Sequence, residues 1–251
     1  MPAPISKPTL PLVVPIVDWP EVKAALGLRP RRLSWPMGAP QPIMEVDEER
    51  TQPMNPEILT ARDWRRNAPL YLDTETTGLD AHAQIVEVAV IDDAGAVLVD
   101  TFVTPTMPIA PAVTAINHIT NEMLAGAPAF PQVWAQLKPI LVGRTVIIYN
   151  AQYDVRLLRQ SAVVHGLTIT AELEAGIDWQ CAMLLYADYH GEWDEYHGNN
   201  RWQNLGLACQ QMRVDKSDIR AHRAAGDCEL TRRLVHKLAE QEPYKMPKVI
   251  A

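Results

Sequence analysis

The stretch "YLDTETTGLD", residues 71–80, carries two acids two positions apart on an apparent strand that ends at a glycine. Successive side chains of a strand point to opposite faces, so Asp73 and Glu75 share one face and Thr74 points away from it. Two adjacent carboxylates repel each other unless a cation lies between them, and magnesium prefers oxygen ligands. The stretch is therefore compatible with a metal site at the end of the first strand. A solvated strand end is the alternative that this triplet alone leaves open.

The composition is that of a protein with a packed core. The chain has 251 residues, of which 47% are hydrophobic and 21% charged, enough for one domain and an extension. The net charge of −7 argues against a passive nucleic-acid coat, but not against an enzyme that grips nucleic acid locally or through metal ions. The three cysteines have no C-x-x-C spacing, and no apolar run is long enough to span a membrane. We therefore expect a cytoplasmic protein with no signal peptide and no membrane partner.

Prolines divide the chain into a Pro-rich N-terminal extension at residues 1–68, a domain at residues 69–240 and a C-terminal tail at residues 241–251. Twelve of the 21 prolines lie in the extension, so we expect no long helix or central strand there. Its tryptophans are Trp19, Trp35 and Trp64. Because these rings need burial, the extension is interpreted either as a tail packed over the domain or as a docking arm for a protein partner.

From residue 69 onward the pattern predicts a mixed sheet flanked by helices. Three short Val-rich segments joined by tight turns indicate an antiparallel meander, after which helices and strands alternate. The elements expected after the first strand are strands at 85–92 and 96–103, short helices at 111–124, a helix at 130–141, a strand at 145–150, a helix at 153–166, a fifth strand within 176–184 that runs into a helix, and two last helices within 200–212 and 222–241.

Two further acids lie near the starts of predicted helices. Asp154, in "YNAQYDVRLL", follows Asn150 in a first helical turn, where the helix dipole by itself also favours an acid. The preceding strand would lie beside the first strand in a mixed sheet, which brings Asp154 towards Asp73. Asp227, in "HRAAGDCELTRRL", borders the buried stripe of the last helix, and an acid beside a core needs a partner or a metal. His222 lies five residues before Asp227, and taken alone it is interpreted as a surface histidine.

The order of these motifs, Asp-x-Glu, Asn-Ala-x-Tyr-Asp and His-x-x-x-x-Asp, resembles the DEDDh family of 3′–5′ exonucleases. That family includes the proofreading epsilon subunit of bacterial DNA polymerase III and exonuclease X. The resemblance covers about residues 69–240 and implies an α/β fold with an RNase H-like mixed five-stranded sheet flanked by helices. One departure is Asn117, where many relatives carry histidine in the loop near the substrate.

The resemblance implies that Asp73, Glu75, Asp154 and Asp227 hold two Mg²⁺ or Mn²⁺ ions and that His222 takes a proton from the attacking water. The expected reaction is hydrolysis of DNA from a free 3′ end to nucleoside 5′-monophosphates, with single-stranded or frayed ends preferred. The residues expected to contact the substrate are Thr76, Thr77, Gly78, Leu79, His118, Ile119, Asn150 and Tyr153, with Leu79 as a wedge against the terminal base and Tyr153 favoured as a packing residue. The alternatives are an exoribonuclease with the same site and a non-catalytic nucleic-acid-binding module.

Overall fold

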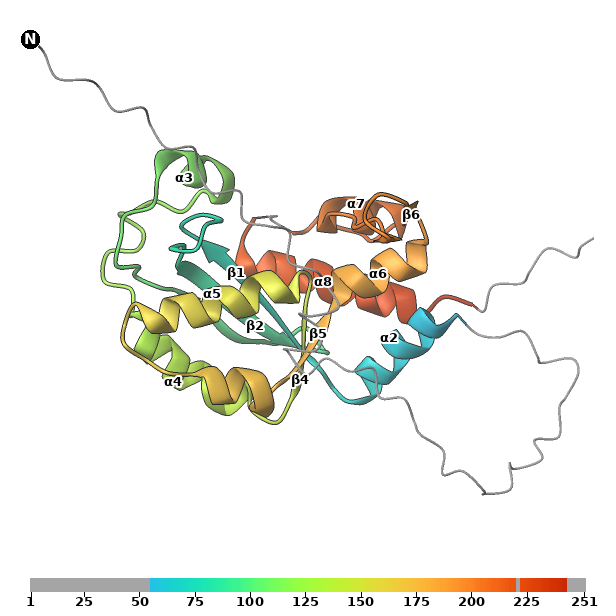
Figure 1. The fold of residues 1–251 in the computed structure, drawn as a ribbon, viewed down its shortest axis with the longest axis horizontal. Coiled ribbons are helices and arrows are strands. Elements are labelled where there is room, and N and C mark those ends of the chain that lie inside the picture. The colour runs from blue at the N-terminus through green and yellow to red at the C-terminus, as the bar shows by residue number, and fades with distance from the viewer. Residues whose placement is uncertain (1–54, 220–221, 243–251) are drawn as a thin grey trace, which may run out of the picture. The chain divides into compact units, whose positions relative to one another are not determined.

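The computed structural model describes residues 55–219 and 222–242, and Figure 1 shows their arrangement. Five strands form one sheet in the order β3-β2-β1-β4-β5. They are β1 (Leu70–Thr76), β2 (Ile85–Asp92), β3 (Val97–Phe102), β4 (Thr145–Ile148) and β5 (Asp178–Cys181). The helices are α2 (Pro56–Arg66), α3 (Pro111–Asn117), α4 (Phe130–Leu141), α5 (Ala151–Val163), α6 (Ala182–His190), α7 (Leu205–Gln211) and α8 (Ala224–Ala239), with a π-helical turn η1 (Glu172–Gly176) and a small hairpin of β6 (Trp193–Asp194) and β7 (Asn199–Asn200). The predicted mixed five-stranded sheet flanked by helices is therefore confirmed.

The directions of the strands place the ends of β1 and β4 together. β1 pairs antiparallel with β2 and parallel with β4, and β4 pairs parallel with β5. The tight turn between β2 and β3 is made possible by Gly95, whose φ of 89° is a conformation that favours glycine. Because β1 and β4 run in the same direction, the acids near the end of β1 and the start of α5 lie at the same edge of the sheet.

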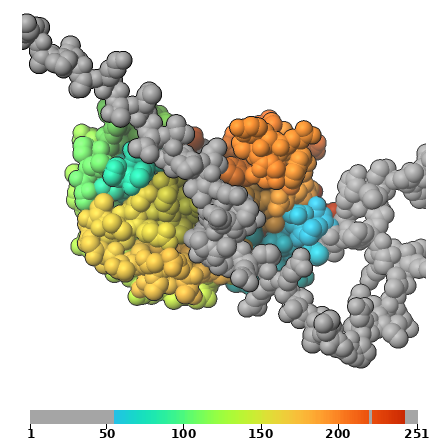
Figure 2. All heavy atoms as spheres, in the orientation of Figure 1, coloured from blue at the N-terminus to red at the C-terminus, as the bar shows by residue number. Residues whose placement is uncertain are grey.

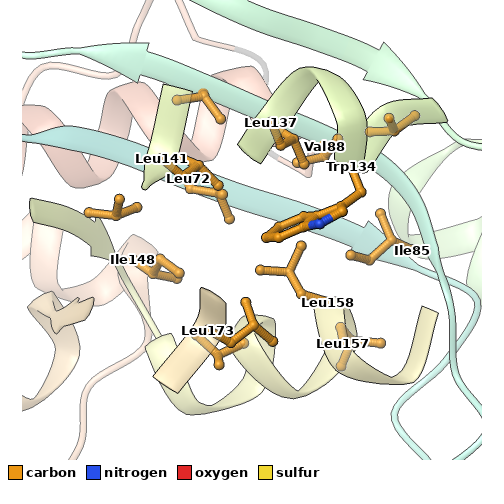
Figure 3. Packing of buried hydrophobic residues seen from close by; sticks show 14 of the residues in the cluster. Leu72, Ile85, Val88, Trp134, Leu137, Leu141, Ile148, Leu157, Leu158 and Leu173 are labelled. Atoms are coloured by element: carbon orange, nitrogen blue, oxygen red, sulfur yellow. The ribbon is translucent and has the colours of Figure 1, made fainter. Parts of the chain in front are cut away.

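Each face of the sheet has its own hydrophobic cluster, as the alternation of side chains along a strand requires. Leu70 and Leu72 of β1 belong to the cluster that includes residues of α4 and α5. Figure 3 shows part of this packing, in which Trp134 and Leu158 approach the strands from the two helices. Tyr71, which points to the other face, belongs to the cluster that includes residues of α2, α6, α7 and α8. The helices that bear catalytic candidates, α5 and α8, thus cover opposite faces.

Helix α2, which has 11 residues, lies within the Pro-rich segment, where no long helix is expected, and one of the prolines of that segment begins it. Pro56 begins the helix, where the missing N–H of proline costs no hydrogen bond, and the Asn55 side chain accepts from the Glu57 and Ile58 amides. Trp64 is buried with Ile58 in the cluster on the α8 face. α2 contacts both α8 and α6, and in Figures 1 and 2 it is the blue segment that lies beside the orange helix α6. The core on this face therefore extends to the N-terminal side of the predicted boundary at residue 69.

The remaining predictions for the chain termini fall outside the described residues. These are the environments of Trp19 and Trp35, the protein partner expected for residues 1–68 and most of the tail at residues 241–251. Among the helices of the described ranges, none combines the length and the apolar character needed to cross a membrane.

We expect a chain that begins at residue 67 to be much less stable than one that begins at residue 55. The shorter chain loses the buried side chains of Ile58 and Trp64 and the hydrogen bond from Arg62 Nε to the Ala239 carbonyl, which is 2.8 Å long. Loss of one large buried side chain costs about 3–5 kcal/mol, so the Tm should fall by about 10 °C or more. Thermal melts of the two chains, with Trp64→Ala in the full chain as the matched control, measure this. Equal Tm values for the two truncated chains would show that α2 adds nothing to the stability of the domain.

Candidate active site

Three carboxylates meet beside the end of β1. One oxygen from each of Asp73, Glu75 and Asp227 lies within 4.8 Å of the other two. The first two residues are on β1, on the face covered by α8, and Asp227 is in the first turn of α8. The next residue of α8, Cys228, is fully buried over the strand, with Sγ donating to the Tyr71 carbonyl at 3.6 Å. Packing of α8 on β1 therefore brings together acids that are about 150 positions apart in the sequence.

Asp154 reaches the same edge of the sheet from the opposite face. It lies in the first turn of α5, is 4% exposed, and accepts a hydrogen bond of 2.7 Å from Thr74 Oγ1. Thr74 points away from the face of Asp73 and Glu75, so Asp154 is not one of the three carboxylates that lie within 4.8 Å of one another. Its charge nevertheless acts on Asp73. Of the four predicted metal ligands, Asp73, Glu75 and Asp227 thus lie together, and Asp154 lies on the opposite face at the end of β1.

Burial raises the pKa values of all four acids, and repulsion by other acids of the group adds to the rise for Asp73 and Glu75. Burial, followed by the charges of Asp154, Asp227 and Glu75, raises the pKa of Asp73 well above its usual range. Burial, with Asp227 as the next cause, raises the pKa of Glu75 to about 8. Burial raises the pKa of Asp154 to about 7, and burial also raises the pKa of Asp227. Clustered acids of this kind need protons or a cation, and a donor set made only of carboxylate oxygens fits Mg²⁺ or Mn²⁺.

We expect the affinity for Mg²⁺ to rise with pH between about 6 and 8, because ion binding must displace protons from carboxyls whose pKa values are raised, as for Glu75 and Asp154. The same shifts should make the metal-free protein lose stability with rising pH. A raised folded pKa contributes stability that is fully present below the unfolded value near 4 and is lost as pH rises through the folded value. Calorimetric Mg²⁺ titrations in buffers of different ionisation enthalpy should show proton release. An affinity that does not change over this pH range, with no proton release, would contradict the prediction.

His222 stands just before α8 with an exposed side chain. Its φ of 59° is in the left-handed region, which residues other than glycine seldom adopt. The following residue, Arg223, is the extended N-cap of α8, so the helix begins two residues later than the sequence pattern indicated. His222 is therefore open to solvent within five residues of Asp227.

The turn after β1 presents an apolar side chain to solvent. Leu79 is 79% exposed, whereas Thr76 is buried and donates from Oγ1 to the Gly78 carbonyl at 2.8 Å. Thr77 is half-buried, and its Oγ1 accepts from the Gln84 amide at 3.0 Å. A Cβ at Gly78 would meet no atom within 4 Å, so the glycine leaves open space at this edge.

One face of α5 holds this turn in place. Tyr153 Oη donates to the Gly78 carbonyl at 2.8 Å, which fits the packing role favoured for this residue. One helical turn further on, Arg156 donates to the Leu79 carbonyl at 3.3 Å, and its guanidinium lies 5.1 Å from the centre of the Tyr153 ring. Gln160 donates to the Ala83 carbonyl at 2.9 Å. No sequence motif marks Arg156 or Gln160, although both lie on one helix face with Tyr153, three and seven residues after it.

The other predicted substrate contacts are divided between surface and core. Ile119 is fully buried in a small cluster with Val86, so the prediction that its side chain lines the substrate rim is wrong. His118 and Asn150 are exposed, which leaves both side chains available. Asn117 is buried, and its Nδ2 lies 3.4 Å from the Thr76 carbonyl, so this residue ties the loop after α3 to the end of β1.

Clustered acids at the end of the central strand of a mixed sheet can hold divalent ions, an arrangement found in several classes of enzyme that act on phosphate esters, nucleases among them. The model of the exonuclease family of RNase T type matches residues 70–235, and the chain belongs to this family. It is an enzyme, a 3′–5′ exonuclease, and the resemblance seen in its motifs is confirmed.

Two relatives and one solved structure illustrate the similarity. Exonuclease CP81 of Escherichia phage 186 is 37% identical over 186 residues, which cover 72% of this chain and 92% of the phage protein. The epsilon subunit of DNA polymerase III from Treponema pallidum is 37% identical over 90 residues, which cover 34% of this chain and 42% of the subunit. E. coli exonuclease I in complex with a dT13 oligonucleotide has a TM-score of 0.54 at 18% identity, covering 69% of this chain and 41% of that chain, a likeness of fold alone.

Proposed function

We propose that this exonuclease hydrolyses DNA from a free 3′ end to nucleoside 5′-monophosphates, with two divalent ions and a preference for single-stranded or frayed ends. The observation that carries the proposal is the set of four acids at the end of β1, three of which are half-buried and have oxygens within 4.8 Å of one another, while the fourth, Asp154, is buried. Their raised pKa values are the expected property of ligands that lack their cation.

The residues present fit two Mg²⁺ or Mn²⁺ ions. Asp73, Glu75 and Asp227 would hold one ion, and Asp154 with Asp73 would hold the second, since their charges already act on each other. When bound, such ions lower the pKa of water and stabilise charge on the attacking and leaving oxygens of an in-line displacement. The protein supplies the oxygen donors and their fixed spacing, with Asp154 held by the hydroxyl of Thr74.

His222 would accept the proton of the attacking water. Its side chain is exposed, it lies beside the start of α8, and it acts on the charge of Asp227. An imidazole changes protonation near neutrality, which suits a general base that works at physiological pH. In this proposal the acids bind the metal ions, and the imidazole of His222 accepts the proton.

The turn after β1 at residues 77–79, called here the Leu79 turn, would select the 3′ end of the substrate. An apolar side chain that is 79% exposed, on a turn whose carbonyls are held by α5, can pack against the base of a terminal nucleotide. Such a wedge favours ends that are already unpaired, because a paired end must first lose its stacking. Thr76, Thr77, Gly78, His118, Asn150 and Tyr153 would complete the surroundings of the terminal nucleotide.

DNA is favoured over RNA by the similarity to the epsilon subunit of DNA polymerase III, which belongs to an enzyme that makes DNA. The net charge of −7 fits an enzyme that grips a short end through metal ions better than one that coats a long strand. The same carboxylates would serve an exoribonuclease, so the substrate must be measured.

The test compares 5′-labelled single-stranded DNA, blunt duplex DNA, duplex DNA with a 3′ overhang, and single-stranded RNA, with Mg²⁺, with Mn²⁺ and with EDTA. We expect metal-dependent ladders that shorten from the 3′ end, fastest on single-stranded DNA, and a block by a 3′-terminal phosphorothioate. Faster degradation of RNA would establish the exoribonuclease alternative. Binding without metal-dependent cleavage of any substrate would establish a non-catalytic module.

A further inference from the structure

An ion pair between the buried Glu87 and the half-buried Arg223 lies beside the acids and is separate from the four proposed ligands. Glu87, on β2, is 1% exposed and lies opposite Glu75 in the register of the two strands. Arg223 Nε donates to both of its carboxylate oxygens, at 3.0 Å and 3.1 Å, and Arg223 Nη2 donates to Oε1 as well. The guanidinium also lies 5.3 Å from the centre of the Phe102 ring. Arg223 is therefore fixed by a fork of hydrogen bonds and by an aromatic ring on the neighbouring strand.

The same carboxylate caps α8. The N-cap residue, Arg223, makes no side-chain capping bond, and the Ala224 amide donates instead to Glu87 Oε2 at 3.1 Å. A carboxylate at the first turn of a helix satisfies an otherwise unpaired amide and interacts favourably with the helix dipole. Glu87 thus binds both the side chain of Arg223 and the backbone amide of Ala224, the two residues that follow His222.

Stability alone gives a poor account of this pair. Removing a carboxylate such as Glu87 from water costs free energy, and even a fully buried ion pair is often no better for stability than an apolar pair of the same volume. Here the negative charge of Glu87 also acts unfavourably on the acids of the site, including Glu75. What the pair does supply is a fixed position for Arg223. This residue directly follows His222, whose backbone φ of 59° is one that non-glycine residues seldom adopt.

We propose that Glu87 and Arg223 are positioning residues that hold His222 in its working place before α8. They act on the backbone of His222 and are not expected to touch the substrate. The inference rests on the proposed function, because it requires His222 to be the general base. Loss of either partner should let the segment before α8 shift, and misplacement of a reacting group by about 1 Å can cost about 10²-fold in rate.

A double-mutant cycle of Glu87→Gln and His222→Ala tests the inference. Single-turnover cleavage of single-stranded DNA is measured at saturating Mg²⁺ for both single variants and for the double variant. We expect Glu87→Gln to lower the rate by about 10–10²-fold with KM changed by less than about twofold. In the background of His222→Ala the same substitution should change the rate by less than about threefold, because the group that it positions is gone.

Two further variants keep the result interpretable. Arg223→Lys retains the charge and loses the fork, so it should show the same rate loss with the same KM. Arg232→Gln is the matched control, since Arg232 makes an equally close two-oxygen pair with Glu229 on α8, at 2.6 Å and 2.7 Å, and contacts the Asp93 carbonyl in the β2–β3 turn. It should keep the wild-type rate even where its Tm falls.

The outcomes separate the two proposals. The positioning role is overturned if the rate loss of the double variant equals the product of the losses of Glu87→Gln and His222→Ala. It is also overturned if Arg232→Gln lowers the rate as much as Glu87→Gln does. In both cases the general base stands. If His222→Ala alone keeps the wild-type rate, the general base assignment is overturned and the positioning role with it. A Glu87→Gln protein that fails to fold leaves Arg223→Lys to give the same comparisons.

Discussion

Replacing Asp73 with alanine is expected to abolish cleavage while the fold stays intact. The substitution removes an acid that belongs to both proposed ion sites, so the loss should reach about 10⁴-fold or more, as when a whole catalytic unit is lost. Asp227→Asn should have a similar effect, because an amide keeps the shape of the carboxylate but not its charge. Since the charges of Asp154, Asp227 and Glu75 repel Asp73, the metal-free variants should melt at the wild-type temperature or slightly above it.

The measurement is Mg²⁺-dependent release of mononucleotides from a 3′ end, together with thermal melts with and without Mg²⁺. The control is Asp178→Asn, at the opposite end of the parallel strands, where the carboxylate is exposed and accepts from Thr145 Oγ1 at 2.9 Å. Asp178→Asn should keep activity and the stabilisation by Mg²⁺. Full activity in Asp73→Ala or in Asp227→Asn would remove the basis for the metal site.

Replacing His222 with alanine should slow catalysis by about 10²–10⁴-fold, the usual contribution of a general acid or base. Binding of a 3′ end should change far less, because the acids and the Leu79 turn remain. A general base must be unprotonated to act, so at Mg²⁺ concentrations that saturate the site at every pH, the variant should lose the dependence of the rate on pH that the base confers. Single-turnover rates across pH measure both effects.

The control for His222 is His197→Ala, since this exposed histidine pairs with Asp194 at 3.0 Å in the β6–β7 hairpin. It should leave the rate and the pH profile unchanged. If His222→Ala retains the wild-type rate and its pH dependence, the imidazole takes no part in proton transfer, and the base must be sought elsewhere at the site.

The sequence by itself determined the order of the elements and the identity of the acids. Strand and helix periodicities are local properties, so the alternation in "YLDTETTGLD" was enough to place Asp73 and Glu75 on one face of a strand. The three motifs in order then predicted the exonuclease fold, which the five-stranded sheet confirms. Motif spacing carries this information because each acid has a fixed place on its own strand or helix.

Only the tertiary structure decided which side chains meet and which are hidden. Thr74, on the face opposite the acids, is the hydrogen-bond partner of Asp154, since α5 approaches from that face. The prolines of the N-terminal segment gave no sign of the helix that buries Trp64, and the motif around Ile119 gave no sign that its side chain is fully buried. Glu87 and Arg223 are 136 residues apart and meet only because α8 begins over β2. Local patterns fix the direction of a side chain within its own element, whereas its partners depend on how elements distant in the sequence pack together.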